Sequence, residues 1–225
     1  MNFAILTVMY NDTKEGYETN MRAFDYFPKE AEQVCIINKS FETPDIDNVR
    51  FIKNDENCLA RAWNIGLKEI FKKYDFVVVS GLDSMAPPLH LIQQLVDLNK
   101  NNPTYGFTAG VALGVQINRY SVEHGDGSFS FYCISKECFE KVGDFDERYK
   151  PAYFEDNDYL ERMWKAGYKP QKDNFVVYHH MFQGTVKQSP ELQKQYAEFM
   201  NRNLAIFKKD YKKVPDHLPK NIIFH

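Results

Sequence analysis

The residues best suited to chemistry begin with Asp83, in the stretch Ser80 to Pro88 that follows the apolar run Asp75 to Val79. The run predicts a buried strand, and open α/β sheets bind ligands beyond the carboxyl ends of their strands. A carboxylate at that place could hold a divalent cation. Taken alone, however, a turn-forming aspartate ahead of a helix is the simpler interpretation of Asp83.

A second group is the acidic cluster Glu155, Asp156 and Asp158 at the start of a helix expected over Asn157 to Ala166. The helix dipole and capping of free amide groups would explain one or two of these acids. Three acids within four residues exceed what capping requires. Two aromatic residues directly precede the cluster, and partial desolvation beside a ring makes a carboxylate a better general base.

A third group is the pair His179 and His180, which follows the strand expected at Asn174 to Tyr178. Neutral imidazole is a common metal ligand, although an isolated histidine pair is more often structural. What favours chemistry is the joint pattern. Asp83, the acidic cluster and His179 each stand where an element begins or ends, so one crevice could receive all of them.

Short apolar runs alternate with amphipathic segments, which predicts an α/β fold with parallel strands. Strands are expected at Phe3 to Met9, Gln33 to Ile37, Phe51 to Ile52, Asp75 to Val79 and Asn174 to Tyr178, with further strands and a mobile loop around Gly125 to Gly127 within Tyr105 to Tyr132. Helices are expected within Thr13 to Glu32 and at Leu59 to Phe71, Leu89 to Asn99, Ser135 to Val142, Asn157 to Ala166 and Ser189 to Tyr211.

Composition and charge argue against several classes of protein. The 225 residues, 44% of them hydrophobic, can bury one substantial core, and a formal net charge of −3 with interspersed signs argues against duplex nucleic acid as a partner. No signal peptide or transmembrane segment is visible, so we expect a cytoplasmic protein. The cysteines form no CxxC pair, which argues against structural zinc; they are Cys35, Cys58, Cys133 and Cys138.

The longest recognisable block is Phe131 to Pro170, FYCISKECFEKVGDFDERYKPAYFEDNDYLERMWKAGYKP. It resembles the GT-A glycosyltransferases, in particular the inverting family 2, which shares a Gly-Phe-Asp-Glu-like turn, an acidic ED-x-D helix start and a closing Gly-Tyr. The resemblance runs from Phe3 to about Gly184. It implies a single GT-A domain with a mixed, mostly parallel sheet flanked by helices and a C-terminal amphipathic helix.

Earlier segments extend the resemblance. TVMYND, which starts at Thr7, is similar to the first strand of the family, and IINKS, which starts at Ile36, is similar to the second. NCLARAWNIGL, which starts at Asn57, is similar to the helix beside the diphosphate. By this resemblance the nucleotide base would meet Thr7, Tyr10 and Asn38, and the diphosphate would meet Asn57, Arg61 and Asn64.

The metal motif departs from the family pattern. The family carries Asp-x-Asp after the central strand, whereas this chain has Gly81, Leu82 and Asp83, so only the second aspartate is present. We expect Asp83 and His179 to hold Mn²⁺ or Mg²⁺, which would stabilise the departing diphosphate. By resemblance Asp156 is the base that deprotonates the acceptor, with Glu155 as the second choice.

The function implied is hexosyltransferase-like: transfer of a sugar from a nucleotide-diphosphate sugar to an acceptor hydroxyl, with inversion. Residues 1–100 would form the nucleotide-binding half, residues 101–188 the acceptor and catalytic half, and residues 189–225 a C-terminal helix and tail. The acceptor, a glycan, a protein, a lipid-linked sugar or a modified base, would lie over Trp164 or the loop Gly125 to Ser128, although Trp63 and Trp164 could both be core residues. Two alternatives stay open: a catalytically silent carbohydrate- or nucleotide-binding module, and a sugar nucleotidyltransferase.

Overall fold

The apolar run near the start of the chain forms the central strand β1 (Phe3–Tyr10), nearly all of it buried. A strand that is apolar on both faces needs neighbours on both sides and cover on both faces. β1 pairs in parallel with β2 (Gln33–Lys39) and with β4 (Phe76–Gly81). The structure is a computed structural model that describes residues 2–113, 129–180, 184–215, 218, 220 and 222–224.

The described residues form an eight-stranded sheet in the order β3-β2-β1-β4-β7-β6-β8-β5. The strands not yet introduced are β3 (Val49–Lys53), β5 (Ser84–Met85), β6 (Tyr105–Leu113), β7 (Phe131–Ser135) and β8 (Lys169–His180). β7 runs antiparallel to β4 and β6, β8 is parallel to β6, and β5 is antiparallel to β8. All strands except β5 and β7 therefore point the same way, and we call the edge where they finish the C-terminal edge.

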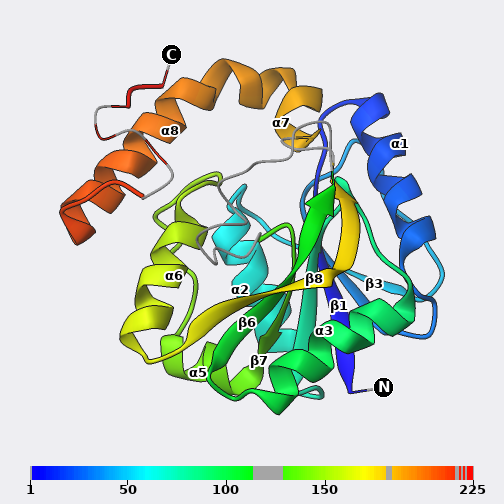
Figure 1. Cartoon of the computed structure of the whole chain (residues 1–225). Helices are drawn as coiled ribbons and strands as arrows, with labels where there is room; N and C mark the ends of the chain where they lie inside the picture. The colour runs from blue at the N-terminus through cyan, green and yellow to red at the C-terminus, as the bar shows by residue number, and fades with distance from the viewer. Residues whose placement is uncertain are drawn as a thin grey trace.

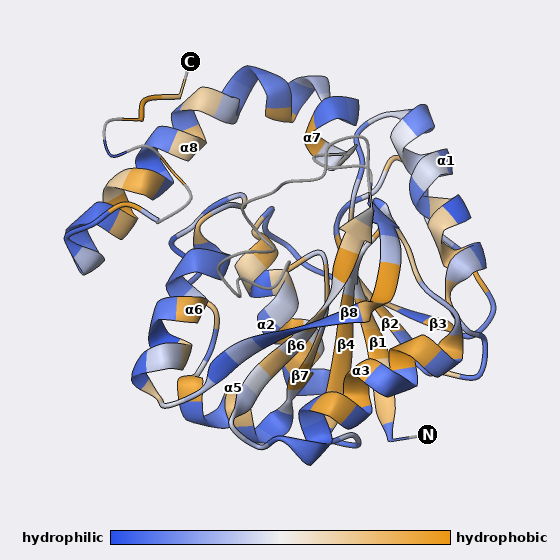
Figure 2. Ribbon diagram, in the orientation of Figure 1, coloured by the Kyte–Doolittle hydropathy of each residue, from blue (hydrophilic) through white to orange (hydrophobic). Residues whose placement is uncertain are grey.

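Helices cover both faces of the sheet (Figure 1). One face packs against α2 (Leu59–Ile70), α5 (Lys136–Val142) and α6 (Glu155–Lys165), and the other packs against α1 (Lys14–Ala23) and α3 (Leu89–Asn101). Apolar colour gathers in the strands, while the helices alternate between apolar and polar stripes (Figure 2). The fold is thus a three-layer α/β arrangement, as the sequence predicts.

The chain ends with α7 (Gly184–Gln188) and α8 (Pro190–Tyr211), and α8 crosses the top of the molecule from α7 to the vicinity of α6 (Figure 1). Its start is fixed by the Ser189 side chain, which accepts a hydrogen bond from the Leu192 amide, and by proline in the first turn. The inner face of α8 builds a separate apolar cluster with two residues that precede α6, Tyr149 and Phe154.

The expected elements are present with small shifts in their bounds, and the following differences bear on the site or on its packing. The helix expected within residues 13–32 ends at Ala23 and continues as a short 3₁₀ turn, Phe24–Tyr26. α6 begins at Glu155 rather than Asn157. β8 begins at Lys169 rather than Asn174, because pairing with β6 holds its polar first half. The loop expected around Gly125 to Gly127 lies outside the described residues, and no helix in the described part is long and apolar enough to cross a membrane.

Candidate active site

The centre of the site is a contact between Asp83 and His180 at the C-terminal edge. Asp83 lies in the turn between β4 and β5, and His180 is the last residue of β8. Residue 84 pairs with residue 180 across the β5–β8 ladder, so backbone hydrogen bonding sets their spacing. Asp83 Oδ1 lies 3.3 Å from His180 Nε2, and both side chains are largely buried.

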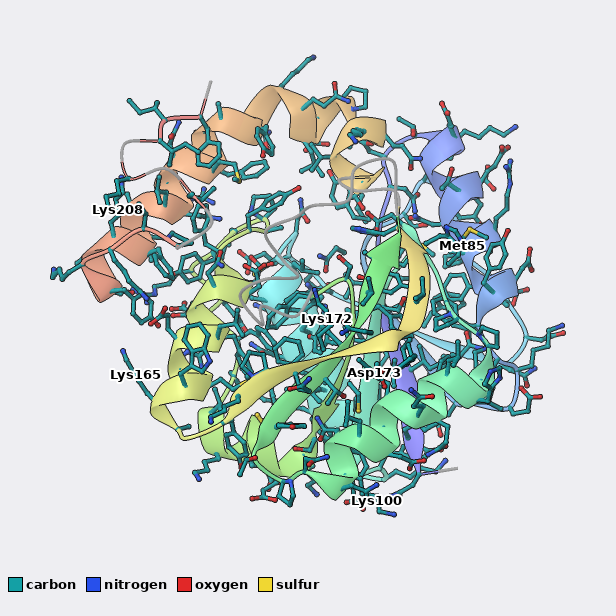
Figure 3. The ribbon with its side chains drawn as sticks, viewed as in Figure 1. Met85, Lys100, Lys165, Lys172, Asp173 and Lys208 are labelled. Carbon is teal, nitrogen blue, oxygen red and sulfur yellow. The ribbon has the colours of Figure 1, made fainter. Side chains whose placement is uncertain are left out.

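His179, the histidine expected to bind metal, lies elsewhere. Successive side chains of a strand point to opposite faces, so residues 179 and 180 cannot both face Asp83. His179 is exposed and pairs with Met85 of β5, which Figure 3 labels beside the ends of β6 and β8. The structure therefore brings Asp83 together with His180 and leaves His179 on the other side of the strand.

The acidic cluster divides into three different environments. Asp158 is buried and accepts hydrogen bonds from Arg162 Nε at 2.9 Å and from the Tyr211 hydroxyl at 2.6 Å. Arg162 lies one turn further along α6, and Tyr211 is the last residue of α8. Asp158 thus links α6 to α8, and its carboxylate is engaged in structural hydrogen bonds.

Glu155 is buried beneath the start of α6, with only 3% of its surface exposed. Burial raises the pKa of its carboxyl well above the usual range, and the charges of Asp156 and Asp158 raise it further. Its Oε2 atom has no hydrogen-bond partner within the described residues. Burial therefore disfavours the charged form of this carboxyl and keeps it away from an acceptor hydroxyl, so it is poorly suited to act as a general base.

Asp156 is partly exposed at the first turn of α6, and its Oδ1 accepts a hydrogen bond from the amide of Asn157 at 2.8 Å. The neighbouring Tyr153 relates this residue to Asp83. Burial raises the pKa of the Tyr153 phenol, and the charges of Glu155, Asp83 and Asp156 add to the effect. Asp83 and the start of α6 therefore both lie within electrostatic reach of one phenol.

Two of the residues expected to meet the base, Tyr10 and Asn38, lie at the ends of β1 and β2. Thr7 is buried within the sheet, and Tyr10 is 9% exposed. Burial raises the pKa of the Tyr10 phenol, while the charge of Lys39 lowers it. Just beyond β1, Asp12 accepts a hydrogen bond from the Ser189 hydroxyl at 2.7 Å. Asn38 accepts a hydrogen bond from the buried Asn54 side chain at 2.7 Å. The residues that join α7 to α8 thus lie against this side of the site.

The residues expected to meet the diphosphate are only partly available. Asn57 and Arg61 are partly exposed near the start of α2, where Arg61 lies 3.6 Å from Glu56. Asn64 is buried and bonded to a turn, because its amide donates to the Phe145 carbonyl at 2.9 Å and accepts from the Phe145 amide at 2.8 Å. Asn64 therefore stabilises the turn at Phe145, which precedes α6 in the sequence.

Trp63 is a core residue, 5% exposed, whereas Trp164 is 40% exposed on α6. Sequence reasoning noted the two aromatic residues before the acidic cluster but missed the contacts that α8 makes with them. The sequence did contain a signal for these contacts: Asn203 is a polar residue within the otherwise apolar stripe of α8, which indicates a buried polar partner. The loop Gly125 to Ser128, the other expected acceptor surface, lies outside the described residues.

Comparison with known proteins identifies the fold. No family model matches the sequence, and no curated protein matches it. Among solved structures, GalNAc-T7 with UDP, GalNAc and Mn²⁺ is similar over 98% of this chain, with a TM-score of 0.63 and 12% identity. S. aureus TarS (residues 1–349) is similar over 93% of this chain, with a TM-score of 0.61 and 15% identity, and the same fragment in complex with UDP has a TM-score of 0.58.

This chain spans 52% of the GalNAc-T7 chain and 74% of the TarS fragment. At 12–15% identity, this structural similarity establishes the fold alone. The chain therefore has the GT-A fold of these glycosyltransferases, as the sequence block Phe131 to Pro170 predicts.

Proposed function

We propose that this chain is a glycosyltransferase that moves a sugar from a nucleotide-diphosphate sugar to an acceptor hydroxyl with inversion. The observation that carries the proposal is the position of Asp83 and His180 at the C-terminal edge of a GT-A fold, with the acidic start of α6 near the same phenol as Asp83. Open α/β sheets bind their ligands at this edge.

The pair Asp83 and His180 fits a divalent cation. Two ligands that each lie about 2.1 Å from an octahedral ion at right angles are about 3.0 Å apart. The observed 3.3 Å between Oδ1 and Nε2 is close to this value. No group of three His, Cys, Asp or Glu side chains in the described residues could hold a metal. Mg²⁺ and Mn²⁺ suit such a site, because phosphate oxygens and water complete the coordination of an ion held by few protein ligands.

When bound, the ion would neutralise charge that develops on the departing diphosphate. The protein residues do the rest. Asp156 is partly exposed and takes the proton from the acceptor hydroxyl as that oxygen attacks the anomeric carbon. Glu155 is buried under the helix, where burial raises its pKa and disfavours the charged form, so Asp156 is the better placed base. Attack from the side opposite the diphosphate inverts the anomeric centre.

Residues 1–100 supply the nucleotide side. Tyr10 and Asn38 lie at the ends of β1 and β2, and Asn57 and Arg61 lie at the start of α2, where they would face the base and the diphosphate. The acceptor half, residues 101–188, contains α6. The acceptor is a glycan, a protein, a lipid-linked sugar or a modified base.

Isothermal titration with UDP, in the presence and absence of Mn²⁺, tests donor binding. We expect Mn²⁺-dependent binding by the wild type and by Asp156→Asn, and weak binding by Asp83→Asn. Release of UDP from UDP-sugars, with water or added sugars as acceptor, tests turnover. Asp156→Asn should lower turnover about 10²- to 10⁴-fold. Asp25→Asn, an exposed aspartate in the 3₁₀ turn, is the matched control.

Three outcomes separate the functions. Binding and slow turnover, lost in Asp156→Asn, support the proposal. Mn²⁺-dependent UDP binding without turnover of any donor supports a binding module. Release of pyrophosphate from a nucleoside triphosphate and a sugar phosphate supports a nucleotidyltransferase.

A further inference from the structure

The loop that leads into α6 has an unusual backbone. Tyr153 and Phe154 are consecutive residues with φ values of 73° and 74°. A left-handed conformation of a bulky residue costs roughly 1–2 kcal/mol, because its Cβ crowds the backbone. Two such residues in succession persist only where surrounding structure holds them. Phe154 is also the N-cap of α6 and has no side chain suited to capping.

Asn203 of α8 supplies part of this support. It is completely buried, and its Nδ2 donates to backbone carbonyls at three positions of the loop. The distances are 3.3 Å to Lys150, 2.9 Å to Ala152 and 3.0 Å to Tyr153. Its Oδ1 accepts from the Arg202 guanidinium at 3.1 Å and 3.2 Å, so the orientation of the amide is fixed from both ends.

Rings of α8 hold the same loop. The Tyr153 ring lies parallel to Phe199, with centroids 6.0 Å apart and an interplanar angle of 8°. Phe154 packs against Phe207 at 6.2 Å. These contacts hold the side chains, while Asn203 fixes the direction of the carbonyl groups. The direction of these peptides determines where α6 starts and where residue 156 points.

We propose that Asn203 is a positioning residue, which sets the first turn of α6 so that Asp156 reaches the acceptor hydroxyl. This inference rests on the proposed function, because it assigns Asn203 an effect on the reaction through Asp156. A residue that merely stabilised the fold would change the melting temperature and leave the turnover of the folded enzyme intact.

The matched pair Asn203→Leu and Asn201→Leu tests this. Asn201 lies on the same helix and also bonds backbone, accepting from the Phe224 amide at 3.0 Å and donating to its carbonyl at 2.8 Å. Phe224 meets the α6 loop through its ring, which lies 6.4 Å from the ring of Phe154, so Asn201→Leu perturbs ring packing on the loop rather than the bonds to its carbonyl groups. We expect Asn203→Leu to lower kcat for UDP-sugar hydrolysis about 10- to 100-fold, while the donor KM and the Kd for UDP with Mn²⁺ stay close to wild type. Asn201→Leu should keep the wild-type kcat.

A wild-type kcat in folded Asn203→Leu would overturn the inference while leaving the proposed function intact. If Asn203→Leu does not fold, Asn203→Ser, which keeps one donor, decides in the same way. If the wild type itself shows no turnover, the proposed function fails, and amide exchange then tests the positioning alone. Faster exchange at Asp158, whose amide bonds the Phe154 carbonyl at 2.9 Å, supports it, and unchanged exchange in the variant refutes it.

Discussion

Removal of one hydroxyl, in Tyr211→Phe, tests the conclusion that Asp158 is structural. The Tyr211 hydroxyl donates to Asp158 Oδ1 at 2.6 Å, and Arg162 holds the other carboxylate oxygen. A hydrogen bond to a charged group contributes about 1.5–3 kcal/mol. For a chain of this size each kcal/mol corresponds to a shift of about 2–4 °C, so the melting temperature should fall by about 3–12 °C.

The assay is thermal unfolding followed by circular dichroism, with urea denaturation to confirm the change in free energy. Tyr17→Phe is the control, because its hydroxyl makes only a 3.5 Å contact with the Thr43 carbonyl at an exposed site. Its unfolding free energy should change by less than about 0.5 kcal/mol. Equal melting temperatures of Tyr211→Phe and the wild type would refute the view that Asp158 joins α6 to α8.

Two further predictions concern stability. Because burial raises the pKa of Glu155 in the folded state, its contribution to stability is full below its ordinary value of 4.5 and is lost as the pH rises toward the folded value. The melting temperature of Glu155→Gln relative to wild type should therefore increase with pH, and a constant difference across the pH range would contradict this reasoning. A Cβ on Gly66 would lie 2.2 Å and 2.8 Å from the two methyl carbons of Leu6. Alanine would gain roughly 1 kcal/mol in helix propensity, but the clash with Leu6 should outweigh this gain. Gly66→Ala should therefore lower the free energy of unfolding, measured by urea denaturation, by about 1–3 kcal/mol. A more stable variant would show that α2 can shift.

The central strands and α2 could be predicted because their apolar residues follow a clear pattern. β1 and β4 are continuous apolar runs, and Trp63 and Leu67 lie on one face of α2. The order in which the later strands pair depends on contacts far apart in the sequence. The polar first half of β8 carries no such pattern and is held by β6.

The site was predictable in its residue types and less so in its geometry. The sequence indicates a histidine partner for Asp83, but whether residue 179 or 180 faces it depends on the register of β8 against β5. A shift of one residue reverses the face of every side chain in a strand. Similarly, the different environments of Asp156 and Asp158 follow from the place where α8 packs on α6, which local sequence does not specify.

The junction between α7 and α8 has a consequence for the order of folding. The Ser189 hydroxyl donates to Asp12 at 2.7 Å across 177 residues of chain, and Thr13 donates to the Gln188 carbonyl across 175. Closing loops of this length is slow, because chain entropy is lost before the contact forms. During synthesis, the end of β1 therefore gains its last neighbours only after α7 and the start of α8 have emerged, and a nascent chain truncated before residue 184 has an unfinished C-terminal edge.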